Sequence, residues 1–105
     1  MIIQINTDNN ISGKENTVTY FTQLVKDSLD RYSEHLSRIE IHLSDENGNK
    51  NSKDDKHCVL EVRIEGKQPI AVTSNANTIE GALNTAIEKV STLLNTTIGQ
   101  MKNHR

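Results

Sequence analysis

The chain has 105 residues, of which 33% are hydrophobic and 25% are charged, and its formal net charge is −2 at pH 7. This length corresponds to one domain, so we expect residues 1–105 to form a single domain without room for a second. The charge balance excludes a strongly basic domain that attracts nucleic acid over long distances, so any binding of nucleic acid must depend on local charge.

Export and membrane insertion are not expected either. No apolar run approaches the roughly 20 residues that a membrane helix needs, and the N-terminus lacks the basic and apolar parts of a signal peptide. Cys58 is the only cysteine, which excludes an internal disulfide. We therefore expect a cytoplasmic protein.

The first third of the chain predicts a strand followed by a helix. Residues 1–6 alternate between isoleucines on one face and polar residues on the other. From Glu15, apolar residues recur every three or four positions, which is typical of an amphipathic helix. This pattern predicts a helix that ends near Tyr32 or Ser33.

The middle of the chain predicts three antiparallel strands. Residues 38–44 and 57–65 alternate strictly between apolar and polar side chains, which indicates two half-buried strands. The polar segment between them is then a long hairpin loop. A tight turn at Gly66 leads into residues 69–73, a short strand that begins with proline.

The last quarter predicts a long helix. Asn77 or Thr78 can cap its start, and an apolar stripe continues from Ile79 to Met101. The order of elements is therefore β-α-β-β-β-α. Because alternating strands leave one face of the sheet polar, we expect an α+β two-layer domain, with both helices on one face of a four-stranded sheet.

Sequence motifs for catalysis or metal binding are absent. Cys58 occupies an inward strand position, where a cysteine is usually an inert core residue and not a nucleophile. His42 and His57 are conceivable cross-strand neighbours on the polar face, but two histidines without a third ligand are more often polar surface than a metal site. We expect no enzyme activity, no cofactor and no metal.

The polar segment between the two strands does not fit a calcium loop. Asp45, Asn47 and Asn49 stand at alternate positions, but Gly48 interrupts the required spacing and no glutamate closes a twelve-residue loop. The positive charges of its lysines also offset the negative charges of its aspartates and glutamate, so the segment is not a strongly acidic loop. We therefore expect a solvated loop that is poorly ordered near residues 47–53.

Three stretches of the sequence carry a resemblance to a known family. They are "RIEIHLSDENG" from Arg38, "DDKHCVLE" from Asp54 and "QPIAVT" from Gln68. In their order and spacing they resemble the hibernation-promoting factor and ribosome-associated inhibitor family, or ribosomal subunit interface proteins, over nearly the whole chain. None of the three stretches is a catalytic signature by itself. The resemblance is therefore specific only because the three occur together, in this order and at this spacing.

The resemblance implies a fold like that of double-stranded RNA-binding domains. It also implies that the protein binds the small ribosomal subunit, contacts ribosomal RNA and holds idle ribosomes inactive, which inhibits translation under stress. The length matches the short form of the family. No reaction, small-molecule substrate or membrane would be involved, and RNA would be recognised through phosphate contacts and shape.

Basic residues would make those phosphate contacts. Arg31 and Lys89 stand where the resemblance places basic residues on the two helices, whereas Ser28, Thr92 and Thr96 replace further basic residues of well-known members. The full set of expected RNA-binding residues is Arg31, Lys89, Arg38, Arg63, Lys102 and Arg105.

An alternative hypothesis is a diverged relative that no longer binds RNA. Such a protein would act as a protein-interaction or stress-response module, through the polar face of the sheet or the polar loop. The acidic balance of the chain favours this alternative. A homodimer through a sheet edge is compatible with the sequence but is not indicated by it.

Overall fold

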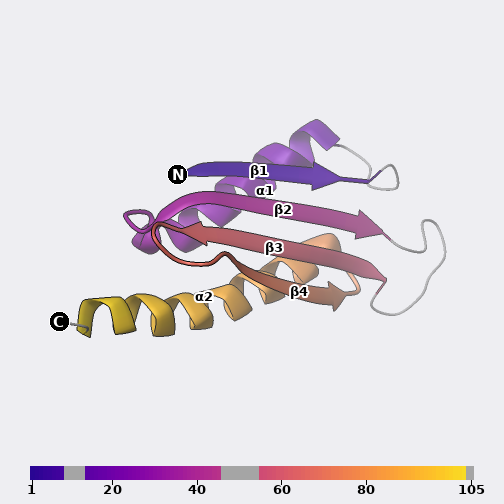
Figure 1. Ribbon diagram of the computed structural model, residues 1–105. Coiled ribbons are helices and arrows are strands. Elements are labelled where there is room, and N and C mark those ends of the chain that lie inside the picture. Colours follow the sequence, from indigo (N-terminus) through magenta and orange to yellow (C-terminus); the bar gives the residue numbers. More distant parts are fainter. Residues whose placement is uncertain (9–13, 46–54, 104–105) are drawn as a thin grey trace.

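The structure is a computed structural model that describes residues 1–8, 14–45 and 55–103 (Figure 1). The described residues have the predicted order of elements, with a short 3-10 helix, η1, after the first α-helix. The elements are β1 (Ile2–Thr7), α1 (Lys14–Leu29), η1 (Asp30–Tyr32), β2 (Leu36–Asp45), β3 (Lys56–Ile64), β4 (Ile70–Ala76) and α2 (Ile79–Asn103).

The four strands form one sheet in the order β1-β2-β3-β4. β1 runs parallel to β2, and the other neighbours are antiparallel. Both helices cover the same face of this sheet, with α1 behind β1 and β2 and α2 along β3 and β4 (Figure 1). The predicted α+β fold with two layers is therefore confirmed.

The core lies between the sheet and the helices. The inward side chains of β2 and β3 are fully or nearly fully buried, and they meet the apolar stripes of α1 and α2. At the start of α2, the Gly81 N–H donates to the Thr78 hydroxyl oxygen at 2.9 Å, so Thr78 is the predicted helix cap. The periodicities in the sequence thus identified the buried faces correctly.

Several element boundaries differ from those predicted, and three of these differences have a clear structural reason. α1 ends at Leu29, and η1 continues the winding with a tighter turn that keeps Tyr32 buried. β2 begins at Leu36, which is buried and pairs with Ile64 before a register shift. β4 continues to Ala76 because its last residues pair with the start of β3, although they are weak strand formers.

The two ends of the polar loop lie in a buried polar cluster. Asp45 and Lys56 pair across β2 and β3, and the Lys56 ammonium is 3.3 Å from Asp45 Oδ1 and 2.7 Å from Asp55 Oδ1. The hydrogen bond to Asp55 raises the pKa of Lys56. Asp8 Oδ2 accepts the Asp45 N–H at 3.0 Å. The loop prediction was therefore wrong at these ends, and the expected disorder at its centre lies outside the described residues.

None of the helices in the described part of the chain is long and apolar enough to cross a membrane.

Candidate nucleic-acid interface

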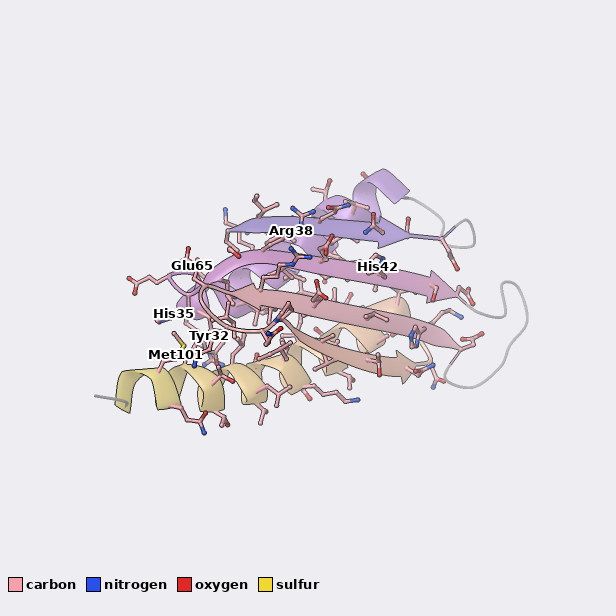
Figure 2. The ribbon with its side chains drawn as sticks, viewed as in Figure 1. Tyr32, His35, Arg38, His42, Glu65 and Met101 are labelled. Carbon is pink, nitrogen blue, oxygen red and sulfur yellow. The ribbon has the colours of Figure 1, made fainter. Side chains whose placement is uncertain are left out.

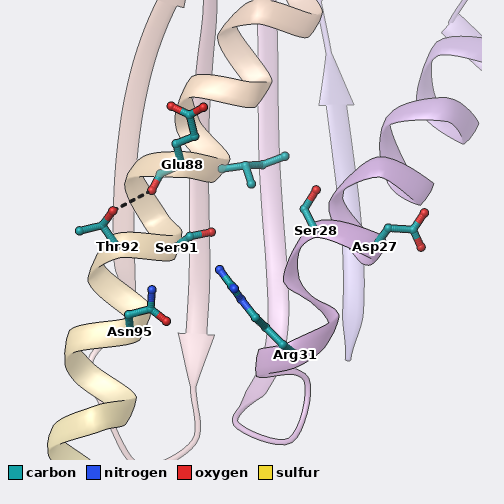
Figure 3. A pocket seen from close by; sticks show the side chains of 8 residues that line it. Asp27, Ser28, Arg31, Glu88, Ser91, Thr92 and Asn95 are labelled. Carbon is teal, nitrogen blue, oxygen red and sulfur yellow. Dashed lines mark hydrogen bonds between the residues drawn. The ribbon is translucent and has the colours of Figure 1, made fainter.

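A polar groove separates α1 and α2 on the helical side of the molecule (Figure 3). Its volume is about 640 Å³, and it is open to solvent. Arg31, which follows the end of α1, extends into this groove towards α2 (Figure 3). The lining residues are Asp27, Ser28, Arg31, Ile87, Glu88, Ser91, Thr92 and Asn95.

Tyr32 connects the two sides of this groove. Its ring lies under the Arg31 guanidinium, whose central carbon is 4.8 Å from the ring centroid. Its hydroxyl donates to Asn95 Oδ1 at 2.5 Å and is 3.4 Å from the Ser91 carbonyl oxygen. One buried side chain therefore contacts the cation of η1 and an amide of α2.

Two acids also line the groove. Asp27 accepts a hydrogen bond from Gln23 Nε2 at 2.8 Å. The carboxylates of Asp27 and Glu88 both point away from the Arg31 guanidinium (Figure 3). Arg31 is exposed and has no ion pair among the described residues. Its positive charge is therefore available to a ligand.

Lys89 lies on another side of α2. Its ammonium donates to the Thr73 carbonyl oxygen of β4 at 2.7 Å, and it does not line the groove. An ammonium has three N–H donors, so two remain for a ligand. The contact also covers part of the free edge of β4. The structure therefore does not bring Lys89 and Arg31 together in one site.

Arg38 lies on the sheet face opposite the helices (Figure 2). The strand register makes Arg63 of β3 its direct partner on the same face. Glu40 lies 3.4 Å from Arg38 and 3.9 Å from Arg63, and Glu61 lies 3.5 Å from Arg63. Arg38 also donates to the side-chain oxygen of Gln4. Each arginine is therefore balanced by a carboxylate, which reduces its attraction for phosphate.

The remaining two expected residues lie at the C-terminus. Lys102 is in the last turn of α2, but its side chain is not among those described. Arg105 lies outside the described residues. The contribution of both to an RNA interface stays a prediction.

The two histidines of the polar sheet face are not direct cross-strand partners. The register pairs His42 with Val59 and His57 with Ser44. His42 Nδ1 is 3.5 Å from the Asn6 amide nitrogen, and His57 Nδ1 is 3.0 Å from the Asn75 amide oxygen. Among the described residues, no three His, Cys, Asp or Glu side chains come together in an arrangement that could hold a metal.

Cys58 is a core residue, as its strand position predicted. Its side chain is 0% exposed, and burial raises the pKa of its thiol to about 12. A thiol becomes a nucleophile only as the thiolate, so Cys58 is chemically inert near neutral pH.

This burial predicts an effect of alkaline pH on stability. The thiol ionises near pH 8.5 in an unfolded chain, so between roughly pH 9 and 12 the unfolded state binds fewer protons than the folded state. The free energy of unfolding should therefore fall as pH rises, by at most about 1.4 kcal/mol per pH unit from this group. Urea unfolding of the wild type and of Cys58→Ala at several pH values measures the effect. Parallel pH dependences in the two proteins would contradict it.

Sequence reasoning missed the contributions of Tyr32, Ser91 and Asn95 to the groove. The sequence predicted Tyr32 only as a possible end of the first helix, and Ser91 and Asn95 are polar residues outside the apolar stripe of the second helix. Tyr32 and Asn95 are 63 positions apart. No periodicity reports such a contact, because it depends on how two helices meet in space.

No protein-family model and no curated protein sequence matches the chain. Two solved structures share its fold over nearly the whole length, each with a TM-score of 0.68. A ribosomal subunit interface protein from Coxiella burnetii is 19% identical, and the match covers 94% of this chain and 99% of that one. The N-terminal domain of Protein Y from Thermus thermophilus is 17% identical, with 92% and 99% covered. These similarities confirm the fold that the sequence resemblance implied.

Proposed function

We propose that the protein is a ribosome-associated factor that binds the small ribosomal subunit through ribosomal RNA and holds idle ribosomes inactive. The observation that carries this proposal is the fold, which matches that of a ribosomal subunit interface protein over 94% of the chain. The three sequence stretches that begin at Arg38, Asp54 and Gln68 support it independently. The protein then acts in the cytoplasm by binding and not by catalysis, and it inhibits translation under stress.

The groove between α1 and α2 is the part of the surface best suited to RNA. Arg31 is its exposed cation, and hydroxyl and amide groups surround it. Arginine, serine and asparagine side chains are common donors to phosphate oxygens. Lys89, on the neighbouring flank of α2, adds a second cation that a long RNA backbone can reach.

The opposite face of the sheet should contribute less affinity. Contact between RNA and Arg38 or Arg63 requires that each arginine give up its interaction with Glu40 or Glu61. A basic residue that is already neutralised releases fewer counterions when it meets phosphate. We therefore assign these two arginines a secondary role in binding.

Co-sedimentation with purified small ribosomal subunits at low and at moderate salt tests the proposal. We expect the protein to pellet with subunits at low salt, and its affinity to fall linearly with the logarithm of salt concentration. The slope should be shallow, because few cations are available. Failure to co-sediment at low salt would overturn the ribosome assignment and favour the protein-interaction module.

A further inference from the structure

We propose that Tyr32 and Asn95 make the groove between α1 and α2 a phosphate-binding site. In this site Arg31 and the side-chain NH2 of Asn95 donate to one phosphate group. The inference deepens the proposed function and rests on it, because the phosphate would come from the backbone of ribosomal RNA.

Tyr32 holds the cation in place. The guanidinium of Arg31 stacks over the Tyr32 ring at 4.8 Å, and the tyrosine is itself only 5% exposed. A guanidinium that lies on a fixed aromatic ring has fewer orientations to lose when it binds a ligand. The N–H groups of Arg31 remain available to a ligand, because the arginine makes no ion pair among the described residues.

Tyr32 also fixes the orientation of the Asn95 amide. A tyrosine hydroxyl has one proton to donate, and here it donates to Asn95 Oδ1 at 2.5 Å. The amide oxygen is therefore occupied, and the NH2 group is left with two donors. Figure 3 shows Asn95 and Arg31 facing each other across the groove. Both ends of the site thus present donors, which is what an anion requires.

The shape of the groove and its charges agree with this ligand. Ser28 and Ser91 add hydroxyl donors, and about 640 Å³ accommodates a phosphate group with its neighbouring sugar. The acids are directed elsewhere, because Asp27 accepts from Gln23 and Glu88 points away from Arg31. A phosphate at the Arg31 end therefore does not meet a carboxylate directly.

The variant Asn95→Asp distinguishes phosphate binding by Asn95 from a purely structural role of this residue in linking the two helices. Aspartate retains an oxygen that accepts the Tyr32 hydroxyl, so the link between the helices is kept. It replaces the NH2 donors by an oxygen, which repels phosphate. A structural role predicts no change in ligand affinity, whereas we expect a loss of at least about tenfold. Asn84→Asp is the matched control, because Asn84 is exposed on α2 but does not line the groove.

NMR titration with inorganic phosphate, against chloride at equal ionic strength, measures binding to the site itself. We expect side-chain signals of Arg31 and Asn95 to shift in the wild type and in Asn84→Asp, and not in Asn95→Asp. Tyr32→Phe, which keeps the ring but frees the amide, should weaken phosphate binding by about threefold. Absence of phosphate binding to the wild type, or equal binding by Asn95→Asp, would overturn the inference.

Co-sedimentation of the same variants with small ribosomal subunits distinguishes an RNA phosphate from free phosphate. Loss of subunit binding in Asn95→Asp but not in the control Asn84→Asp supports an RNA phosphate in the groove. If the wild type binds subunits but not phosphate, the inference fails and the proposed function stands. If it binds phosphate but not subunits, the proposed function fails, and so does the assignment of the ligand to RNA.

Discussion

Replacing Arg31 by glutamine is expected to weaken binding of the protein to small ribosomal subunits by about tenfold, because a charge-assisted hydrogen bond to phosphate is lost. Arg31 is exposed in the groove and has no ion pair among the described residues. The slope of log affinity against log salt should also decrease by about one unit. Co-sedimentation across a series of salt concentrations measures both quantities.

Arg63→Gln is the matched control for this experiment. It removes the same charge, but from an arginine that Glu40 and Glu61 already balance on the opposite face of the sheet. We expect less than about a threefold change in affinity, as is usual for exposed ion pairs. If both variants lost affinity equally, net charge and not the groove would determine binding. If Arg63→Gln alone lost affinity, the interface would lie on the sheet.

The fold could be predicted from the sequence because burial follows local periodicity. Residues of β2 and β3 alternate between core and solvent, and α2 carries one apolar stripe from Ile79 to Met101. Strand boundaries were predicted less accurately. The extension of β4 to Ala76 depends on pairing with Lys56 of β3 and not on the strand propensity of the last residues of β4. Local patterns identify which face is buried, whereas pairing determines where a strand ends.

The site was less predictable, because its properties depend on contacts between distant residues. Arg31 was identified as a candidate, but the sequence did not show that Tyr32 would link it to Asn95. Arg38 and Arg63 looked like available cations until the strand register placed them beside Glu40 and Glu61. Whether a charge is free or neutralised is a property of the fold, so a list of basic residues overestimates how many cations are available to a ligand.

The polar segment between β2 and β3 also shows that burial and charge pairing depend on contacts between distant residues. Its composition predicted a solvated loop, yet Asp45 and Asp55 are buried and share the ammonium of Lys56. Composition alone cannot show this, because the same acids would be exposed if no lysine lay opposite them. A buried carboxylate requires a partner, and here the register of β2 and β3 supplies it.

Leu94→Ala is expected to destabilise the protein by about 2–5 kcal/mol, because it leaves a cavity between α2 and the sheet. The Leu94 side chain is 0% exposed. For a domain of this size such a loss lowers the melting temperature by at least about 10 °C. Thermal unfolding followed by circular dichroism measures it. Asn95, which lines the groove, directly follows Leu94 in α2. If the substitution loosens this part of α2, subunit binding should also weaken near the melting temperature.

Leu93→Ala provides a control on the same turn of α2. Leu93 is 43% exposed, so the same truncation removes little buried surface and should change stability by less than about 0.5 kcal/mol. Alanine also favours the helix slightly more than leucine. A large loss of stability in Leu93→Ala would mean that this side chain is buried against another surface in solution. Similar small effects in both variants would show that α2 does not pack on the sheet through Leu94, and the groove that α2 forms with α1 would then have a different shape.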